Sequence, residues 1–185
     1  MIDEISKLNP VIRVQSRIVK KKAVPEIFEL IDSYLDDYCR FYSISHEQAE
    51  KSIATFNEQY SNDLKVFIQT GRYPFEIETD TVRISRIDYD LFLISSMLFT
   101  WHRHRIAQEL FALRKLFCQS AHTALIGFGS GVELVLLGAN HPHVDAYDVS
   151  ISDFVKNRYK NVTFITEEFG TDTTKKGYDC IFAIE

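Results

Sequence analysis

The sequence predicts an α/β protein in which a mainly helical module, residues 1–120, precedes a Rossmann-like parallel sheet in residues 121–185. Three observations lead to this fold class. Apolar residues recur at helical spacing through most of the first part. After Ser120 short apolar runs alternate with helical segments, and a cluster of glycines follows the first of these runs directly. Strands that alternate with helices form right-handed βαβ units, and therefore a parallel sheet.

Two helices of the first part are marked by their ends. Pro25 suits a first helical turn, and apolar residues then recur at helical spacing to about Phe41. Ser45 and Gln48 have the spacing of a capping box at the start of the next helix, and Gly71 occupies the position of a C-cap glycine. These signals predict two helices with well-defined boundaries.

The rest of the helical module is predicted from its apolar pattern. Residues 73–86 alternate in polarity around a proline and are expected to form a loop or a short hairpin. From Asp88 to Phe117 the chain is helical, either as one helix or as two that meet near Thr100. Because Leu91–Phe99 is apolar on almost every face, this helix is expected to be buried by the other helices.

The second part is predicted to contain four short strands and two short helices. The strands are expected at residues 124–126, 144–147, 162–165 and 178–184, and the helices at residues 132–137 and 150–159. A Rossmann-like arrangement of the strands has the order 3-2-1-4, which leaves the fourth strand at an edge. Because exposed apolar edges recruit partners, we expect a chain that ends at Glu185 to self-associate through this strand or to aggregate, unless a helix covers the strand.

Composition and charge exclude several classes of protein. A hydrophobic fraction of 45% with 25% charged residues is typical of a globular protein. The net charge of -5 argues against a broad phosphate-binding surface, so nucleic acid is not an expected partner. The one basic run, Arg13 to Lys22, is interpreted as a solvated segment ahead of the first clear helix. The acidic start and the lack of a long apolar run predict neither a signal peptide nor a membrane span, and hence a cytoplasmic location.

Cysteine and histidine positions do not predict a metal site or a disulfide. Cys39, Cys118 and Cys180 are far apart and form no C-x-x-C pair. His102 and His104 are two residues apart, which places their side chains about 200° apart on a helix, so one metal ion cannot take both. We interpret these histidines as surface or capping residues and predict no metal.

A glycine-rich loop and an aspartate are the candidate binding residues. Gly127, Gly129 and Gly131 directly follow the first strand and open a helix, which is where open α/β sheets bind ligands. Glycine lets the backbone approach a ligand, and the helix start supplies free N–H donors. Asp148 ends the second strand, where a carboxylate can accept hydrogen bonds from both ribose hydroxyls of a nucleoside. Its alternative role is to cap the next helix, and the two roles can coexist.

The spacing of the loop distinguishes two families of nucleoside-binding proteins. The dinucleotide-binding fingerprint requires glycine at the position of Val132, and the spacing here is G-x-G-x-G. From Ala124 to Glu185 the sequence resembles class I S-adenosylmethionine-dependent methyltransferases. The resemblance implies that S-adenosylmethionine is the cofactor, that the glycine loop wraps its methionine and ribose parts, that Asp148 holds the ribose, and that Glu168 lies near the adenine.

The sequence departs from this family at two points. The family usually has an acidic residue two positions before the first motif glycine, where it contacts the amino group of the cofactor, and here that position is Leu125. The family also continues through a fifth strand and an antiparallel pair beyond the position of Glu185. The resemblance therefore implies that residues 121–185 are an incomplete binding domain, its first half.

The resemblance implies an enzyme that transfers the methyl group of S-adenosylmethionine to a small-molecule substrate. Because alignment of the acceptor supplies much of the rate of such a reaction, a base is optional, and no catalytic residue is assigned. A related alternative is transfer of the aminocarboxypropyl arm, as in nicotianamine synthase-like enzymes, which also place a helical module before the glycine loop. Alternatives from other classes are a non-catalytic nucleoside-binding or dimerisation module and an NAD-dependent oxidoreductase, which Val132 disfavours.

Overall fold

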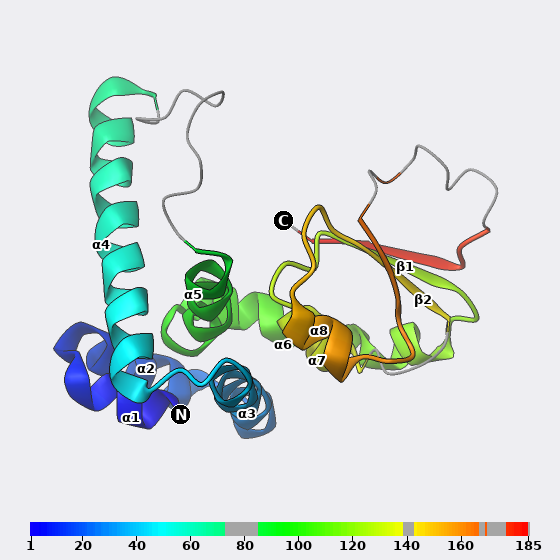
Figure 1. The fold of residues 1–185 in the computed structure, drawn as a ribbon, viewed down its shortest axis with the longest axis horizontal. Coiled ribbons are helices and arrows are strands. Elements are labelled where there is room, and N and C mark those ends of the chain that lie inside the picture. The colour runs from blue at the N-terminus through cyan, green and yellow to red at the C-terminus, as the bar shows by residue number, and fades with distance from the viewer. Residues whose placement is uncertain (73–84, 139–142, 167–168, 170–176, 185) are drawn as a thin grey trace.

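The computed structural model describes residues 1–72, 85–138, 143–166, 169 and 177–184. Their fold is α/β, with a parallel four-stranded sheet preceded by a helical module, as predicted (Figure 1). The helices of the first part are α1 (Ile2–Leu8), α2 (Pro10–Lys22), α3 (Pro25–Phe41), α4 (His46–Thr70), α5 (Arg86–Phe99) and α6 (Trp101–Gln119). The second part contains β1 (Thr123–Ile126), α7 (Val132–Leu137), β2 (Val144–Tyr147), α8 (Asp153–Arg158), β3 (Thr163–Ile165) and β4 (Cys180–Ala183).

The first two helices are the main correction to the sequence analysis. The basic run does not precede the first helix, because it lies within α2, whose last turn is Lys20 to Lys22. The side chain of Asn9 accepts hydrogen bonds from the backbone N–H groups of Val11 and Ile12, and Pro10 occupies the first helical position. Asn followed by Pro is a recognised start signal, so this pair could have revealed the helix.

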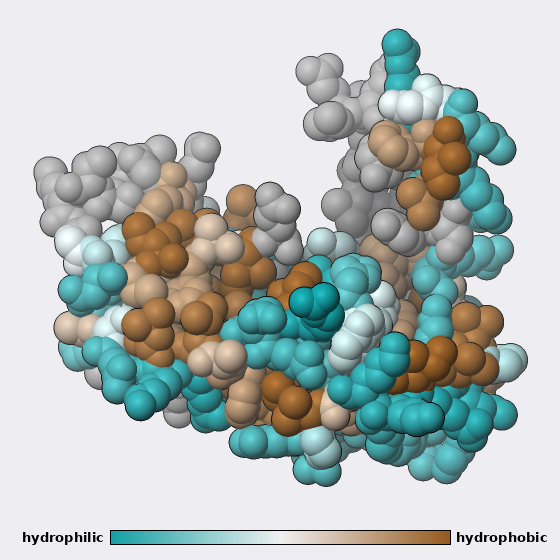
Figure 2. Space-filling view, turned by 180° about the vertical axis from the view of Figure 1, so that it is seen from behind, coloured by the Kyte–Doolittle hydropathy of each residue, from teal (hydrophilic) through white to brown (hydrophobic). Residues whose placement is uncertain are grey.

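The predicted ends of α4 are confirmed, and of the two alternatives for Asp88 to Phe117 the structure has two helices rather than one. Ser45 and Gln48 form the capping box, and Gly71 ends α4 in the left-handed conformation, at φ 69°. Thr100 separates α5 from α6. The predicted loop or hairpin at residues 73–86 lies almost entirely outside the described residues. In Figure 2, α4 projects from the body of the molecule as a separate column.

One of the two histidines of α6 is buried, and it has the capping role that the sequence analysis allowed for it. The ring of His104 packs near Phe28 and Trp101, and its Nδ1–H donates to the carbonyl oxygen of Met97 at 2.9 Å. Because Met97 lies in the last turn of α5, His104 caps that helix from within the core. His102 is exposed.

The sheet is parallel throughout and has the order β3-β2-β1-β4, as predicted. In its register, Leu125 lies between Ala146 of β2 and Phe182 of β4. α6, α7 and α8 lie on one side of the sheet (Figure 1). β4 forms an edge of the described sheet, and its Ile181 side chain is 54% exposed. Self-association through this strand stays a prediction.

A single hydrophobic core joins the two parts of the chain. One cluster of buried residues includes Ile31 and Leu35 of α3, Leu98 of α5, and Leu125 and Leu136 of the second part. The sheet is therefore supported by the helical module across the boundary near residue 120. Among the residues that the structure describes, no helix has the length and the apolar character needed to cross a membrane.

Candidate functional site

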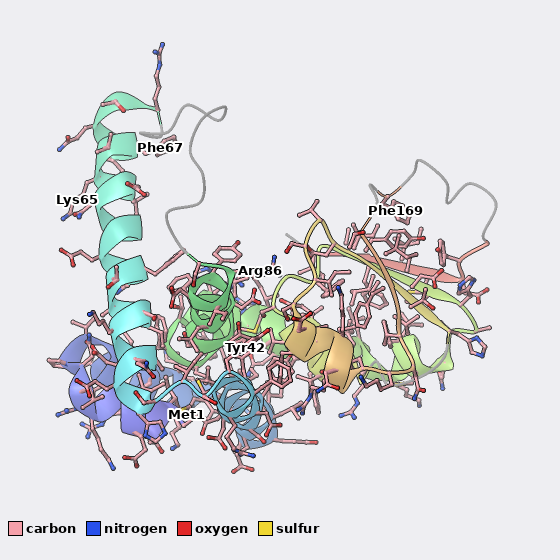
Figure 3. All side chains as sticks on the ribbon, viewed as in Figure 1. Met1, Tyr42, Lys65, Phe67, Arg86 and Phe169 are labelled. Carbon is pink, nitrogen blue, oxygen red and sulfur yellow. The ribbon has the colours of Figure 1, made fainter. Side chains whose placement is uncertain are left out.

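The carboxyl ends of β1, β2 and β4 open into a cavity of about 610 Å³. The second part of the chain contributes Ile126, Gly127, Gly129, Glu133, Tyr147, Asp148, Val149, Phe169 and Ile184 to its lining. The helical module contributes Arg86, Tyr89, Leu93 and Arg103. Arg86 is the first residue of α5, and in Figure 3 it lies on the side of this helix that faces the sheet, while Phe169 lies above the sheet. The cavity is thus enclosed by both parts of the chain, and its volume is within the ~300–1,000 Å³ typical of small-molecule sites.

The glycine loop adopts a conformation that side chains at two of its positions would disturb. Gly127 has φ 69°, and a Cβ there would collide with the carbonyl oxygen of Ile184 at the end of β4. Gly129 has φ 54° and lines the cavity beside Leu93 of α5. Gly131 does not line the cavity. It faces the side chains of Val155 and Tyr34, which a Cβ at this position would meet.

The helical module holds the glycine loop through its carbonyl oxygens. Nη2 of Arg86 donates to the carbonyl oxygen of Gly129 at 2.9 Å, and the Tyr34 hydroxyl donates to the carbonyl oxygen of Ser130 at 3.0 Å. Arg86 is in turn paired with Asp90, with 2.8 Å between Nε and Oδ1. Burial raises the pKa of Asp90 to about 6, and the positive charge of Arg86 opposes this rise. Sequence reasoning missed these contacts, because they join residues that are far apart in the chain.

Asp148 links the end of β2 to the glycine loop. Its Oδ2 accepts a hydrogen bond from the backbone N–H of Gly129 at 2.8 Å, and its Oδ1 accepts one from the N–H of Ser150 at 3.1 Å. The helix that follows is capped by Ser152, so Asp148 is not the cap of α8. An ionised carboxylate has about four acceptor positions, so two remain for hydroxyl groups of a ligand in the cavity.

Glu133 is the most deeply buried charged side chain that lines the cavity. It lies in the first turn of α7 with 5% of its surface exposed, and its Oε2 has no hydrogen-bond partner among the described residues. Burial raises its pKa to about 7. The positive charge of Arg103 opposes this shift, and the negative charges of Asp148 and Asp90 add to it. Nε of Arg103 is also buried without a hydrogen-bond partner.

Sequence reasoning missed Glu133, although a signal was present. Residues 132–137 read Val-Glu-Leu-Val-Leu-Leu, so Glu133 is the single polar residue of a short helix beside the glycine loop. A helix that is otherwise apolar is buried on most faces, and a carboxylate within it faces either solvent or a cavity. The sequence could have identified the residue as a candidate.

The predicted site residues are only partly brought together. Gly127, Gly129 and Asp148 line one cavity, and Gly131 faces α3 and α8 instead. Glu168 lies outside the described residues. Within the described part of the chain, no group of three or more His, Cys, Asp or Glu side chains is arranged to hold a metal ion.

Comparisons of the chain with protein-family models, curated proteins and solved structures found no match. Its function is therefore inferred from the cavity itself.

Proposed function

We propose that this chain binds S-adenosylmethionine in the cavity at the ends of β1, β2 and β4, and that it transfers the methyl group to a small-molecule acceptor. The observation that carries the proposal is the position of the cavity. In the order β3-β2-β1-β4 the chain adds β2 and β3 on one side of β1 and then returns to add β4 on its other side. The position between β1 and β4 is therefore a topological switch point, and open parallel sheets bind ligands there. Gly127 from the β1 end and Ile184 from the β4 end both line the cavity.

The residues in the cavity fit a nucleoside with a flexible arm. Gly127 lets the end of β1 lie directly against the carbonyl oxygen of Ile184, and Gly129 lines the cavity at φ 54° beside Leu93. Asp148 retains acceptor positions for ribose hydroxyls beside the N–H of Gly129. Tyr147 and Phe169 meet edge to face, with 5.1 Å between ring centroids, and supply apolar surface for a base.

The sulfonium group of the cofactor supplies an activated methyl carbon, which an acceptor attacks in line. The contribution of the chain is then to orient the two reactants and to exclude water. Arg86, Tyr89 and Leu93 of α5 line one side of the cavity, and an acceptor would lie on this side. We assign no general base to this step.

The proposal is tested by calorimetric titration of the full chain with S-adenosylmethionine, S-adenosylhomocysteine and NAD. We expect the first two to bind and NAD not to bind. Binding of NAD alone would instead favour an oxidoreductase, and absence of binding by all three would rule out the proposed activity. Among the products, S-adenosylhomocysteine identifies methyl transfer, whereas 5′-methylthioadenosine identifies transfer of the aminocarboxypropyl arm.

A further inference from the structure

The outward side of α2 carries an apolar row that has no role in the proposed function. Val11, Val14 and Ile18 form this row, and each of them is between 48% and 58% exposed. They lie three and four positions apart, so their side chains follow one side of the helix. Ile12 and Val19, which belong to the hydrophobic core, lie on the other side. α2 therefore has two apolar sides, and only one of them packs against the described chain.

Basic side chains border the apolar row on both sides. By the period of 3.6 residues per turn, Lys22 lies on one side of the row, and Arg17 and Lys21 lie on the other. All three are exposed, and none of them pairs with a carboxylate among the described residues. The ammonium group of Lys22 lies 5.4 Å from the centre of the Trp101 ring, a contact that leaves its charge intact. These three residues are the basic border of the row.

The charge of this end of the chain is opposite in sign to that of the whole protein. Residues 1–24 contain six Lys and Arg and two Asp and Glu, although the whole chain has a net charge of -5. The two acids are already paired, Asp3 with Lys20 at 2.8 Å and Glu4 with Lys7 at 2.7 Å. The basic border therefore presents a positive charge that no neighbouring acid of this segment compensates.

The charge and the composition of this surface favour an anionic bilayer over a protein partner. A two-fold dimer through the apolar row would bring the basic borders of both copies together, and like charges in an interface are costly. The residues that dominate binding between proteins are enriched in Trp and Tyr, and Val is under-represented among them. The row contains only Val and Ile. Apolar side chains flanked by Lys and Arg are typical of helices that lie in the interface of an anionic bilayer.

We infer that α2 binds to the surface of a bilayer that contains anionic lipids. The apolar row enters the headgroup region, and the basic border contacts the negative groups of the lipids. This contact is peripheral and involves no helix that crosses the bilayer. In Figure 1, α1 and α2 lie at the opposite end of the molecule from the strands, and Figure 2 shows hydrophobic residues beside hydrophilic ones at this end. The cavity at the ends of the strands is therefore not part of the contact.

The test is co-sedimentation of the full chain with vesicles. One set of vesicles contains phosphatidylcholine only, and the other contains two parts of phosphatidylcholine and one part of phosphatidylserine. We expect the parent to bind the mixed vesicles at least about tenfold more tightly than the neutral ones, because several basic side chains contribute. Binding to the mixed vesicles should fall as the salt concentration rises, since salt screens exposed charges.

Two double variants separate the apolar row from the basic border. Arg17→Gln with Lys21→Gln should weaken binding to the mixed vesicles by at least about tenfold, because each basic residue near an anionic bilayer contributes about fivefold. Val14→Ser with Ile18→Ser should weaken it by a similar factor, because less apolar area enters the bilayer.

The matched control is Lys115→Gln with Leu116→Ser on α6. Both side chains are exposed, and they lie near the end of α6 that precedes the sheet. This variant removes one basic and one apolar side chain from another surface of the molecule, and it should bind the mixed vesicles like the parent. Circular dichroism confirms the fold of each variant.

Several results would overturn the inference. The parent could fail to bind the mixed vesicles, or it could bind both kinds of vesicle equally. Binding like that of the parent in both α2 variants would show that another surface is responsible, and loss of binding in the α6 control would show that no particular surface is. A dimer by light scattering that Val14→Ser with Ile18→Ser dissociates, without binding to vesicles, would make the row an interface between copies. None of these results depends on whether the chain binds S-adenosylmethionine.

Discussion

The two parts of the chain contribute to the cavity in different ways. The second part supplies groups from a local sequence pattern, in which a strand, a glycine loop and a helix are followed by an aspartate at the end of the next strand. The helical module supplies Arg86 of α5 and Arg103 of α6, which line the cavity, and Tyr34 of α3, which binds the glycine loop at the carbonyl oxygen of Ser130. The binding loop is thus readable from local sequence, whereas the groups that hold and cover it depend on tertiary packing.

The largest effect is expected when the two parts are separated. Deletion of residues 1–85 removes α1 to α4, which exposes the apolar surface of α5 and deletes the α3 residues of the shared core. We expect the remaining chain to be insoluble or unfolded. The measurement is the solubility of the 86–185 fragment and its amide dispersion by NMR. A soluble fragment with a native-like spectrum would show that the sheet folds without the module.

The next effect concerns the stability cost of Glu133. The folded chain holds the pKa of this carboxyl at about 7, raised from 4.5, so the folded state binds more protons than the unfolded state between these values. Stability therefore falls as the pH rises through this window, and the full cost applies above pH 7. At about 1.4 kcal/mol per pKa unit, Glu133→Gln should increase the free energy of unfolding by roughly 3 kcal/mol at pH 8.

Near pH 4 the same substitution should have little effect, because the glutamate is then protonated in both states. Urea unfolding of the parent and the variant at both pH values measures the difference. An effect of equal size at the two pH values would show that packing of the amide, and not the charge, is responsible.

Sequence reasoning succeeded where a local signal sets the structure. The capping box at Ser45, the C-cap at Gly71 and the break at Thr100 each depend on residues within a few positions, and all three are present. The βαβ pattern predicts the parallel sheet, and the order 3-2-1-4 is the usual one of the Rossmann-like arrangement. In contrast, the burial of Glu133 depends on how α3 and α6 pack against α7, and the contact of Arg86 with Gly129 joins residues that are 43 positions apart. The local pattern marks Glu133 as a candidate, but it encodes neither the depth of its burial nor the contact of Arg86 with Gly129.

A smaller effect is expected at Asp148, which belongs to the group of cavity residues that local sequence predicts. Asp148→Ala removes an acceptor for the ribose hydroxyls and also releases the N–H of Gly129. It should weaken binding of S-adenosylmethionine by at least about tenfold, since ~1.4 kcal/mol is one decade. Asp148→Asn keeps the shape of the side chain and one acceptor oxygen, so its affinity for the cofactor should lie between that of the parent and that of Asp148→Ala. Calorimetric titration would contradict the ribose assignment if Asp148→Ala binds as tightly as the parent.

The smallest effect is expected at the contact of α3 with the loop. Tyr34→Phe keeps the ring, which lies edge-on to Phe154 with 5.2 Å between centroids, and removes the hydroxyl that donates to Ser130. The loss of one buried hydrogen bond should cost about 1 kcal/mol in the free energy of unfolding. Chemical denaturation measures this cost. If stability and cofactor affinity are both unchanged, the helical module does not hold the loop through Tyr34.

The continuous core also limits how such a chain can evolve. A module that both completes the core of the sheet and binds the carbonyl oxygens of the glycine loop cannot be exchanged as an independent cassette, because its replacement would have to reproduce both functions at once. Descendants of this protein are therefore expected to change the two parts together. Recombination at the boundary near residue 120 should yield few folded chimaeras.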